Sequence, residues 1–161
     1  MNIFELAKNQ EKQAEETYRK LAAVAATEGL RTIFTRLAET ESRHFEIIQK
    51  MEKAEKVEIS DSDILSYAEE AINKMNFGRE QFKMATSQNE TYKAALAQEA
   101  EAEKFYREHA EKSTDEHQQR VFLALSNEEH KHYIVLENII EFINFPTNHP
   151  ENAEFHALEE R

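Results

Sequence analysis

The two stretches Glu41-Ser42-Arg43-His44 and Glu129-His130-Lys131-His132 decide the fold of this chain. Each has the form Glu-x-x-His, and residues three apart lie on one face of an α-helix, about one turn from each other. The same face also carries apolar side chains at alternating steps of four and three. These are Leu30, Phe34, Leu37, Ile48 and Met51 in the first half, and Phe122, Leu125, Leu136 and Ile139 in the second. A carboxylate and an imidazole are therefore set into each of two core-facing stripes.

The presence of ionisable groups on core-facing stripes requires an explanation, because burying such groups unpaired costs several kcal/mol each. A single Glu-x-x-His is most simply a salt-bridged pair on the surface. Two copies, both in hydrophobic stripes, favour a metal site instead.

The two motifs belong to a longer internal repeat with an offset of 88 residues. The string EKQAEETYRKLA at 11–22 matches EAEAEKFYREHA at 99–110, and Phe34, Leu37, Glu41 and His44 match Phe122, Leu125, Glu129 and His132. A repeat of this length indicates two copies of one helix pair.

The repeat adds one more carboxylate to each half, Glu11 and Glu99, seven residues before the matched tyrosines. In an antiparallel helix pair with a rise of about 1.5 Å per residue, the heights of Glu11 and of the first Glu-x-x-His along the helix axis differ by only about 5 to 9 Å. The two can therefore approach the same level. Two such pairs bring four glutamates and two histidines together. This is the di-iron carboxylate arrangement of ferritin-like bundles.

The composition favours long helices in one domain. The 161 residues include only two glycines and two prolines. The absence of cysteine excludes disulfides, thiolate zinc sites and cysteine-held iron–sulfur clusters. A formal net charge of −12 argues against a nucleic-acid partner and is compatible with attracting divalent cations. With neither a signal peptide nor a membrane span visible, we expect a cytoplasmic protein that binds no membrane.

We expect an all-α fold: a ferritin-like antiparallel four-helix bundle with a long crossover connection and a short C-terminal helix. The bundle should occupy 1–145, with repeat halves at about 2–54 and 89–143, a connection at 55–88, and a tail or short helix at 146–161. The predicted bundle helices are 2–27, 30–54, 89–112 and 116–143.

Local signals set the expected boundaries of these helices. Glu28-Gly29 is expected to break the chain between the first two helices. Ser60 to Asp63 should cap a helix that runs to about Met75, and Pro146 and Pro150 should end the bundle. Exchange of the connection between two subunits remains an alternative to a crossover.

The chain resembles the rubrerythrin branch of the ferritin-like di-iron carboxylate proteins. The matching strings are EKQAEETY with ESRH in the first half and EAEAEKFY with EEHKH in the second, and the resemblance covers nearly the whole chain. It implies two iron ions, with manganese or zinc as substitutes. The implied activity is reduction of hydrogen peroxide, a defence against oxidative stress, or oxidation of ferrous iron.

The resemblance also implies roles for the six residues, which are the expected catalytic and metal-binding set. Glu41 and Glu129 would bridge the metals, and the terminal ligands would be Glu11, His44, Glu99 and His132. From their positions on the same stripes, Tyr18 and Tyr106 are expected either to hydrogen-bond to a ligand glutamate across the bundle or simply to pack their rings in the core.

Two features depart from the resemblance. Full-length rubrerythrins carry a rubredoxin module with four cysteine ligands, and a chain without cysteine needs a separate electron-donor protein. Many rubrerythrins also have an extra glutamate three residues after the third-helix ligand. Here that position is Ala102, flanked by Glu101 and Glu103.

These departures leave three functions open. The first is a di-iron peroxidase that reduces hydrogen peroxide with electrons from an external donor. The second is a ferroxidase or iron-handling protein, with dioxygen as the oxidant, and the third is a non-catalytic helical metal-binding module. We expect a homodimer.

The remaining histidines are expected to lie outside the ligand set. His109 should face inward beyond Tyr106, as a hydrogen-bonded core residue or as a proton donor or occasional ligand. His130 should point away from the cluster, and the expected surface residues are His117, His149 and His156.

Overall fold

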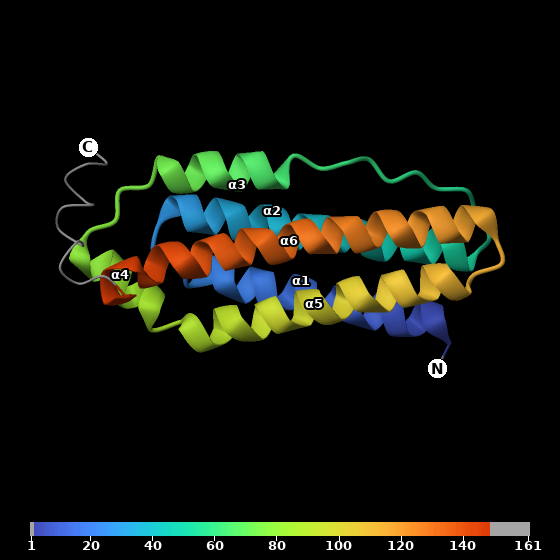
Figure 1. The fold of residues 1–161 in the computed structure, drawn as a ribbon, viewed down its shortest axis with the longest axis horizontal. Coiled ribbons are helices and arrows are strands. Elements are labelled where there is room, and N and C mark those ends of the chain that lie inside the picture. The colour runs from blue at the N-terminus through green and yellow to red at the C-terminus, as the bar shows by residue number, and fades with distance from the viewer. Residues whose placement is uncertain (1, 149–161) are drawn as a thin grey trace.

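The structure is a computed structural model, and it describes residues 2–148, with side chains through Asn144. Its helices are α1 Ile3–Ala23, α2 Glu28–Glu52, α3 Ile64–Asn73, α4 Arg79–Thr86, α5 Asn89–Lys112 and α6 Glu116–Asn148, and residues 2–148 contain no strand. The four long helices, α1, α2, α5 and α6, run side by side along the long axis of the molecule (Figure 1). The predicted all-α bundle is confirmed.

The bundle consists of two helical hairpins, as the repeat predicts. The helix α1 packs mainly on α2, and α5 packs mainly on α6. After α2 the chain returns along the outside of the bundle as an extended segment and α3, and α4 then leads into α5 at the opposite end (Figure 1). This long connection is a crossover, and α3 packs against both α6 and α2.

The turn between α1 and α2 lies earlier than the sequence suggested. It spans residues 24–27, and Thr27 caps α2 by accepting a hydrogen bond from the Leu30 N–H (3.1 Å). The prediction that Glu28-Gly29 breaks the chain was therefore wrong, since both residues are helical. A Cβ atom at Gly29 would lie 2.8 Å from the Met75 side chain, so the glycine allows close packing rather than a turn.

The connection also differs from the prediction in its details. Asp63 precedes α3, but its side chain makes no capping hydrogen bond. It accepts one from Arg36 instead (2.8 Å), and this bond ties the start of α3 to α2. The short helix α4 was not predicted: the sequence analysis placed its residues within the connection at 55–88 and expected no helix after about Met75.

At its C-terminal end, α6 extends to Asn148, beyond Pro146, where we expected the helix to end. A proline inside a helix removes one backbone hydrogen bond and its ring crowds the carbonyl group four residues earlier, yet α6 continues for two residues beyond Pro146. The predicted short C-terminal helix falls largely on 149–161, which lie outside the described residues.

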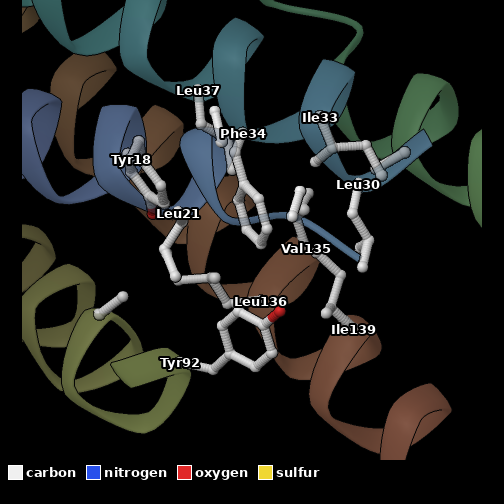
Figure 2. Packing of buried hydrophobic residues seen from close by; sticks show 14 of the residues in the cluster. Tyr18, Leu21, Leu30, Ile33, Phe34, Leu37, Tyr92, Val135, Leu136 and Ile139 are labelled. Carbon is white, nitrogen blue, oxygen red and sulfur yellow. The ribbon is translucent and has the colours of Figure 1, made fainter. Parts of the chain in front are cut away.

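Two apolar clusters fill the core, and a polar layer separates them. One contains Tyr18, Phe34 and Leu136, and the other contains Tyr106, Phe122 and Leu125. Figure 2 shows the first cluster, in which side chains from α1, α2, α5 and α6 meet. On every bundle helix, the candidate ligands lie between residues of one cluster and residues of the other.

We predict that truncating Leu125 destabilises the fold far more than truncating Leu123 on the same helix. Leu125 is fully buried, whereas Leu123 is 43% exposed. Leu125→Ala should lower the free energy of unfolding by about 2–5 kcal/mol, and Leu123→Ala by under about 0.5 kcal/mol. Urea unfolding followed by circular dichroism measures both. Equal losses would show that α6 does not pack with this face inward.

Candidate metal centre

One side chain from each of α1 and α5 and two from each of α2 and α6 meet in the middle of the bundle. The spacing of the Glu-x-x-His units places both members of each pair on the inner face of its helix. All are at most 2% exposed to solvent: Glu11, Glu41, His44, Glu99, Glu129 and His132. The structure therefore brings together all six residues that the sequence singled out.

The six residues form two overlapping groups, each able to hold a metal ion. The first is Glu11, Glu41, His44 and Glu129, and the second is Glu41, Glu99, Glu129 and His132. Within each group, one potential ligand atom from every residue lies within 4.8 Å of the others. Glu41 and Glu129 belong to both groups, so they lie between the two candidate metal positions.

Both imidazoles direct Nδ1 towards the carboxylates. His44 Nδ1 lies 3.2 Å from Glu129 Oε1 and 3.5 Å from oxygens of Glu11 and Glu41. His132 Nδ1 lies 3.1 Å from Glu41 Oε1. Neither Nδ1 makes a hydrogen bond, so these approaches bring the ligand atoms close together without a hydrogen bond between them.

Whether a metal fits the cluster can be judged from its buried polar atoms that have no hydrogen-bond partner. Its buried side-chain atoms without a hydrogen-bond partner are Glu11 Oε2, both carboxylate oxygens of Glu41, His44 Nδ1, Glu99 Oε2, Glu129 Oε1 and both ring nitrogens of His132. Buried polar atoms in native proteins are almost always hydrogen-bonded, and each exception needs a cause. Cations between the two groups would satisfy carboxylate oxygens and imidazole nitrogens at once. The donor set therefore fits two metal ions.

Two tyrosines hold the outer carboxylates in place. Tyr18 donates a hydrogen bond to Glu99, and Tyr106 donates one to Glu11, each at 2.6 Å. Burial, together with the nearby carboxylates, raises the pKa of both phenols well above 10, so they remain protonated and donate to these carboxylates. Each bond crosses from one hairpin to the other.

In the absence of metal, the cluster favours its protonated forms. Burial raises the pKa of Glu41 and of Glu129 well above the ordinary value, and the neighbouring carboxylates raise both further. Burial alone would lower the pKa of His44 and His132, but the adjacent carboxylates, Glu11 and Glu99 respectively, outweigh it and raise both. Metal binding must therefore displace protons, and it should strengthen as the pH rises.

The other residues that the sequence considered lie apart from the cluster. Ala102 is buried, Glu101 is exposed, and Glu103 pairs with Arg107 and with the exposed His130, so no extra carboxylate reaches the cluster at 101–103. His109 packs against Phe105 at a ring distance of 4.4 Å, and burial lowers its pKa. It belongs to neither candidate metal group.

The surface predictions for the three remaining histidines have mixed outcomes. His117 is partly buried, and its Nε2 accepts a hydrogen bond from the Val57 N–H (3.2 Å), so it holds the connection against α6. His149 and His156 lie outside the described residues.

Sequence reasoning missed one buried carboxylate, that of Glu128. It is 3% exposed and pairs with Lys131 at 2.8 Å, and it also accepts a hydrogen bond from the Ser62 N–H (3.4 Å). These contacts hold the connection against α6 directly beside the Glu-x-x-His unit. The i, i+3 spacing of Glu128 and Lys131 was a signal, but nothing in the sequence placed Ser62 next to them.

We predict that metal-free protein loses stability as the pH rises from about 5 to about 8. The folded pKa values of Glu41, Glu129 and both histidines are raised, so their contribution is present at low pH and disappears as the pH rises through those values. Glu41→Gln should flatten this dependence and stabilise the metal-free protein near pH 8 by about 1–3 kcal/mol, because it removes one buried charge. Chemical unfolding with a chelator present measures this.

Glu39→Gln is the matched control for that substitution. Glu39 is exposed on α2, two residues from Glu41. The stability of metal-free Glu39→Gln should therefore change with pH as that of the wild type does. Metal-free wild type that is more stable at pH 8 than at pH 5 would contradict the prediction.

Comparison with known proteins identifies a family for this chain. The rubrerythrin family model matches residues 2–140 of the 161-residue chain. No curated protein and no solved structure matched the chain. None of the helices in the described part of the chain has the length and apolar character of a membrane span. The match extends over both helical hairpins and all six clustered residues, and the chain therefore belongs to the rubrerythrin family, whose domain is a ferritin-like helical bundle.

Proposed function

We propose that this protein is a di-iron peroxidase that reduces hydrogen peroxide with electrons from a separate donor protein. The observation that carries the proposal is the pair of overlapping ligand groups, each with one imidazole and three carboxylates whose buried oxygens are largely unpaired. In this proposal, Glu41 and Glu129 would contribute to holding both metals, since both groups share them. Glu11 and His44 would complete the site of one metal, and Glu99 and His132 that of the other.

The charge of the ligand set supports two divalent ions. Four glutamates carry four negative charges when ionised, and two ferrous ions carry four positive charges. Mixed carboxylate and imidazole ligation without thiolates suits iron or manganese, and zinc could substitute. When bound as ferrous ions, the two irons supply one electron each, and hydrogen peroxide takes up two electrons and two protons to give two molecules of water.

The side chains of the protein prepare the site for this reaction. Tyr18 and Tyr106 fix the orientation of Glu99 and Glu11, because each carboxylate accepts a short hydrogen bond from a phenol that remains protonated. The apolar clusters on either side exclude water from the bundle axis.

The composition supports a separate electron donor. The 161 residues contain no cysteine and therefore no rubredoxin site, and we propose that another protein supplies the electrons. We propose a homodimer in the cytoplasm as the working unit.

A ferroxidase is the second candidate, and one observation favours it. No carboxylate at 101–103 reaches the cluster, and the extra glutamate of many rubrerythrins is replaced by Ala102. If that glutamate is what directs family members to peroxide, then this site would oxidise ferrous iron with dioxygen instead.

We predict that the reduced protein reacts with hydrogen peroxide at least about tenfold faster than with dioxygen, a difference of about 1.4 kcal/mol in barrier. Stopped-flow absorbance of the iron-loaded, reduced protein with each oxidant measures both rates. His132→Ala should abolish the difference because it removes one proposed ligand, whereas His130→Ala, at an exposed position on the same helix, should keep it. Equal rates with both oxidants, together with turnover of added ferrous iron, would establish the ferroxidase.

We also predict that Tyr106→Phe slows peroxide reduction while both metals remain bound. The variant loses the hydrogen bond to Glu11 but retains the ring that packs against Phe122. A loss of about tenfold is expected for removing such a support of a ligand. Tyr92→Phe is the control, since Tyr92 is also a core tyrosine but its hydroxyl group bonds Gln88 instead. Metal analysis beside the rate measurement separates loss of metal from loss of orientation.

A further inference from the structure

A cavity of about 260 Å³ opens between α1 and α5 and reaches the carboxylate cluster. Glu99 and Glu129 form part of its wall, and both are at most 2% exposed. Its outer part is lined by Gln10 and Gln13 of α1 and by Gln98 and Glu101 of α5. We call this cavity the α1–α5 mouth.

The mouth presents oxygen atoms without opposing cations. Among the described residues that line it, none is a lysine, an arginine or a histidine. Gln10 Oε1 is buried without a hydrogen-bond partner, as are Glu99 Oε2 and Glu129 Oε1 at the inner end. Carboxylate and amide oxygens are the ligands that hard divalent cations prefer, and a passage lined by one sign of charge concentrates ions of the opposite sign.

Two pairs of residues that line the mouth match across the 88-residue repeat. Gln10 matches Gln98, and Ala14 matches Ala102. The two alanines are buried and line the cavity, so a small side chain from each hairpin keeps the passage open. At its inner end the passage reaches Glu99 and Glu129, and Glu129 belongs to both candidate metal groups.

A second cavity, of about 390 Å³, approaches the cluster from the side of α2 but suits cations less well. It borders His44 beneath the connection, and both Arg36 and Arg43 line it. Its acidic residues are largely matched by cations, because Asp63 pairs with Arg36 (2.8 Å), and Asp61 and Glu128 both pair with Lys131.

We propose that the α1–α5 mouth is the route by which divalent metal cations enter the carboxylate cluster. Gln10, Gln98 and Glu101 replace the water around an incoming ion step by step, and Glu99 and Glu129 receive it at the inner end. This inference goes beyond the proposed peroxidase, because metal entry requires no redox reaction. A failed oxidant assay would leave it intact.

The test follows loading of metal-free protein with cobalt(II) alone, by stopped-flow absorbance of the bound ion. Glu101→Lys places a cation at the mouth and should slow loading by about tenfold, with a smaller effect at high salt. Glu58→Lys makes the same change in net charge at an exposed residue that lines the second cavity, and it should leave the rate within about twofold. Final cobalt stoichiometry should be unchanged in both.

Two further variants, which differ in whether a larger side chain enters the mouth, test the same route in the same cobalt-loading experiment. Ala102→Leu fills the mouth and should slow loading, whereas Ala100→Leu makes the same substitution at an exposed position of α5 and should not. Circular dichroism and the final cobalt spectrum show that each variant is folded and retains the cluster. Equal slowing by Glu101→Lys and Glu58→Lys, greater slowing by Glu58→Lys, or an unchanged rate in Ala102→Leu would each overturn the proposal.

Discussion

Repulsion among four buried carboxylates is the constraint on which the rest of this structure depends. Two unit charges about 4 Å apart repel by about 4 kcal/mol at an effective dielectric constant of about 20, and the cluster contains several such pairs. The fold cannot relieve this by exposure, since all four carboxylates are at most 2% exposed. Nor do lysine or arginine side chains reach the cluster: the ion pairs of these four carboxylates within residues 2–148 involve only His44 and His132. Protons or metal cations must supply the charge, which makes the stability of the bundle dependent on what the cluster binds.

The same constraint accounts for the tyrosines that join the two hairpins. Tyr18 of α1 bonds Glu99 of α5, and Tyr106 of α5 bonds Glu11 of α1. Few other contacts join α1 to α5, because each packs mainly on its own hairpin partner. The two phenols therefore connect the halves at the level where the carboxylates would otherwise push them apart. Each phenol also gives one carboxylate oxygen a hydrogen-bond partner, so that oxygen needs no metal ion to satisfy it.

The sequence predicted the buried residues of the cluster better than the helix boundaries and the contacts of the connection. The stripes of α2 and α6 and the 88-residue repeat identified every clustered residue, because a carboxylate in a periodic apolar stripe is costly to bury unless a cation or a proton neutralises it. The boundaries were harder. Gly29 suggested a turn, but its role is set by contact with Met75, 46 positions later in the chain. The contacts of Glu128 with Lys131 and Ser62 could not be predicted from the sequence either. They depend on where the extended connection crosses the bundle.

That crossover makes the two halves of the site unequal. The inner layers follow the repeat closely: Tyr18 stacks on Phe34, which stacks on Tyr92, and the matching rings of Tyr106, Phe122 and Phe4 stack in the same order. The connection covers only one side, where it forms a cavity beside His44. His132 borders neither that cavity nor the α1–α5 mouth, and both its ring nitrogens are buried without partners. Two ligand sets of equal composition therefore border different cavities: His44 of the first lies at the cavity beneath the connection, and Glu99 of the second lies at the α1–α5 mouth. The cavity beside His44 is formed by the one segment that the repeat does not duplicate, so that part of the asymmetry comes from the topology of the chain rather than from the ligands.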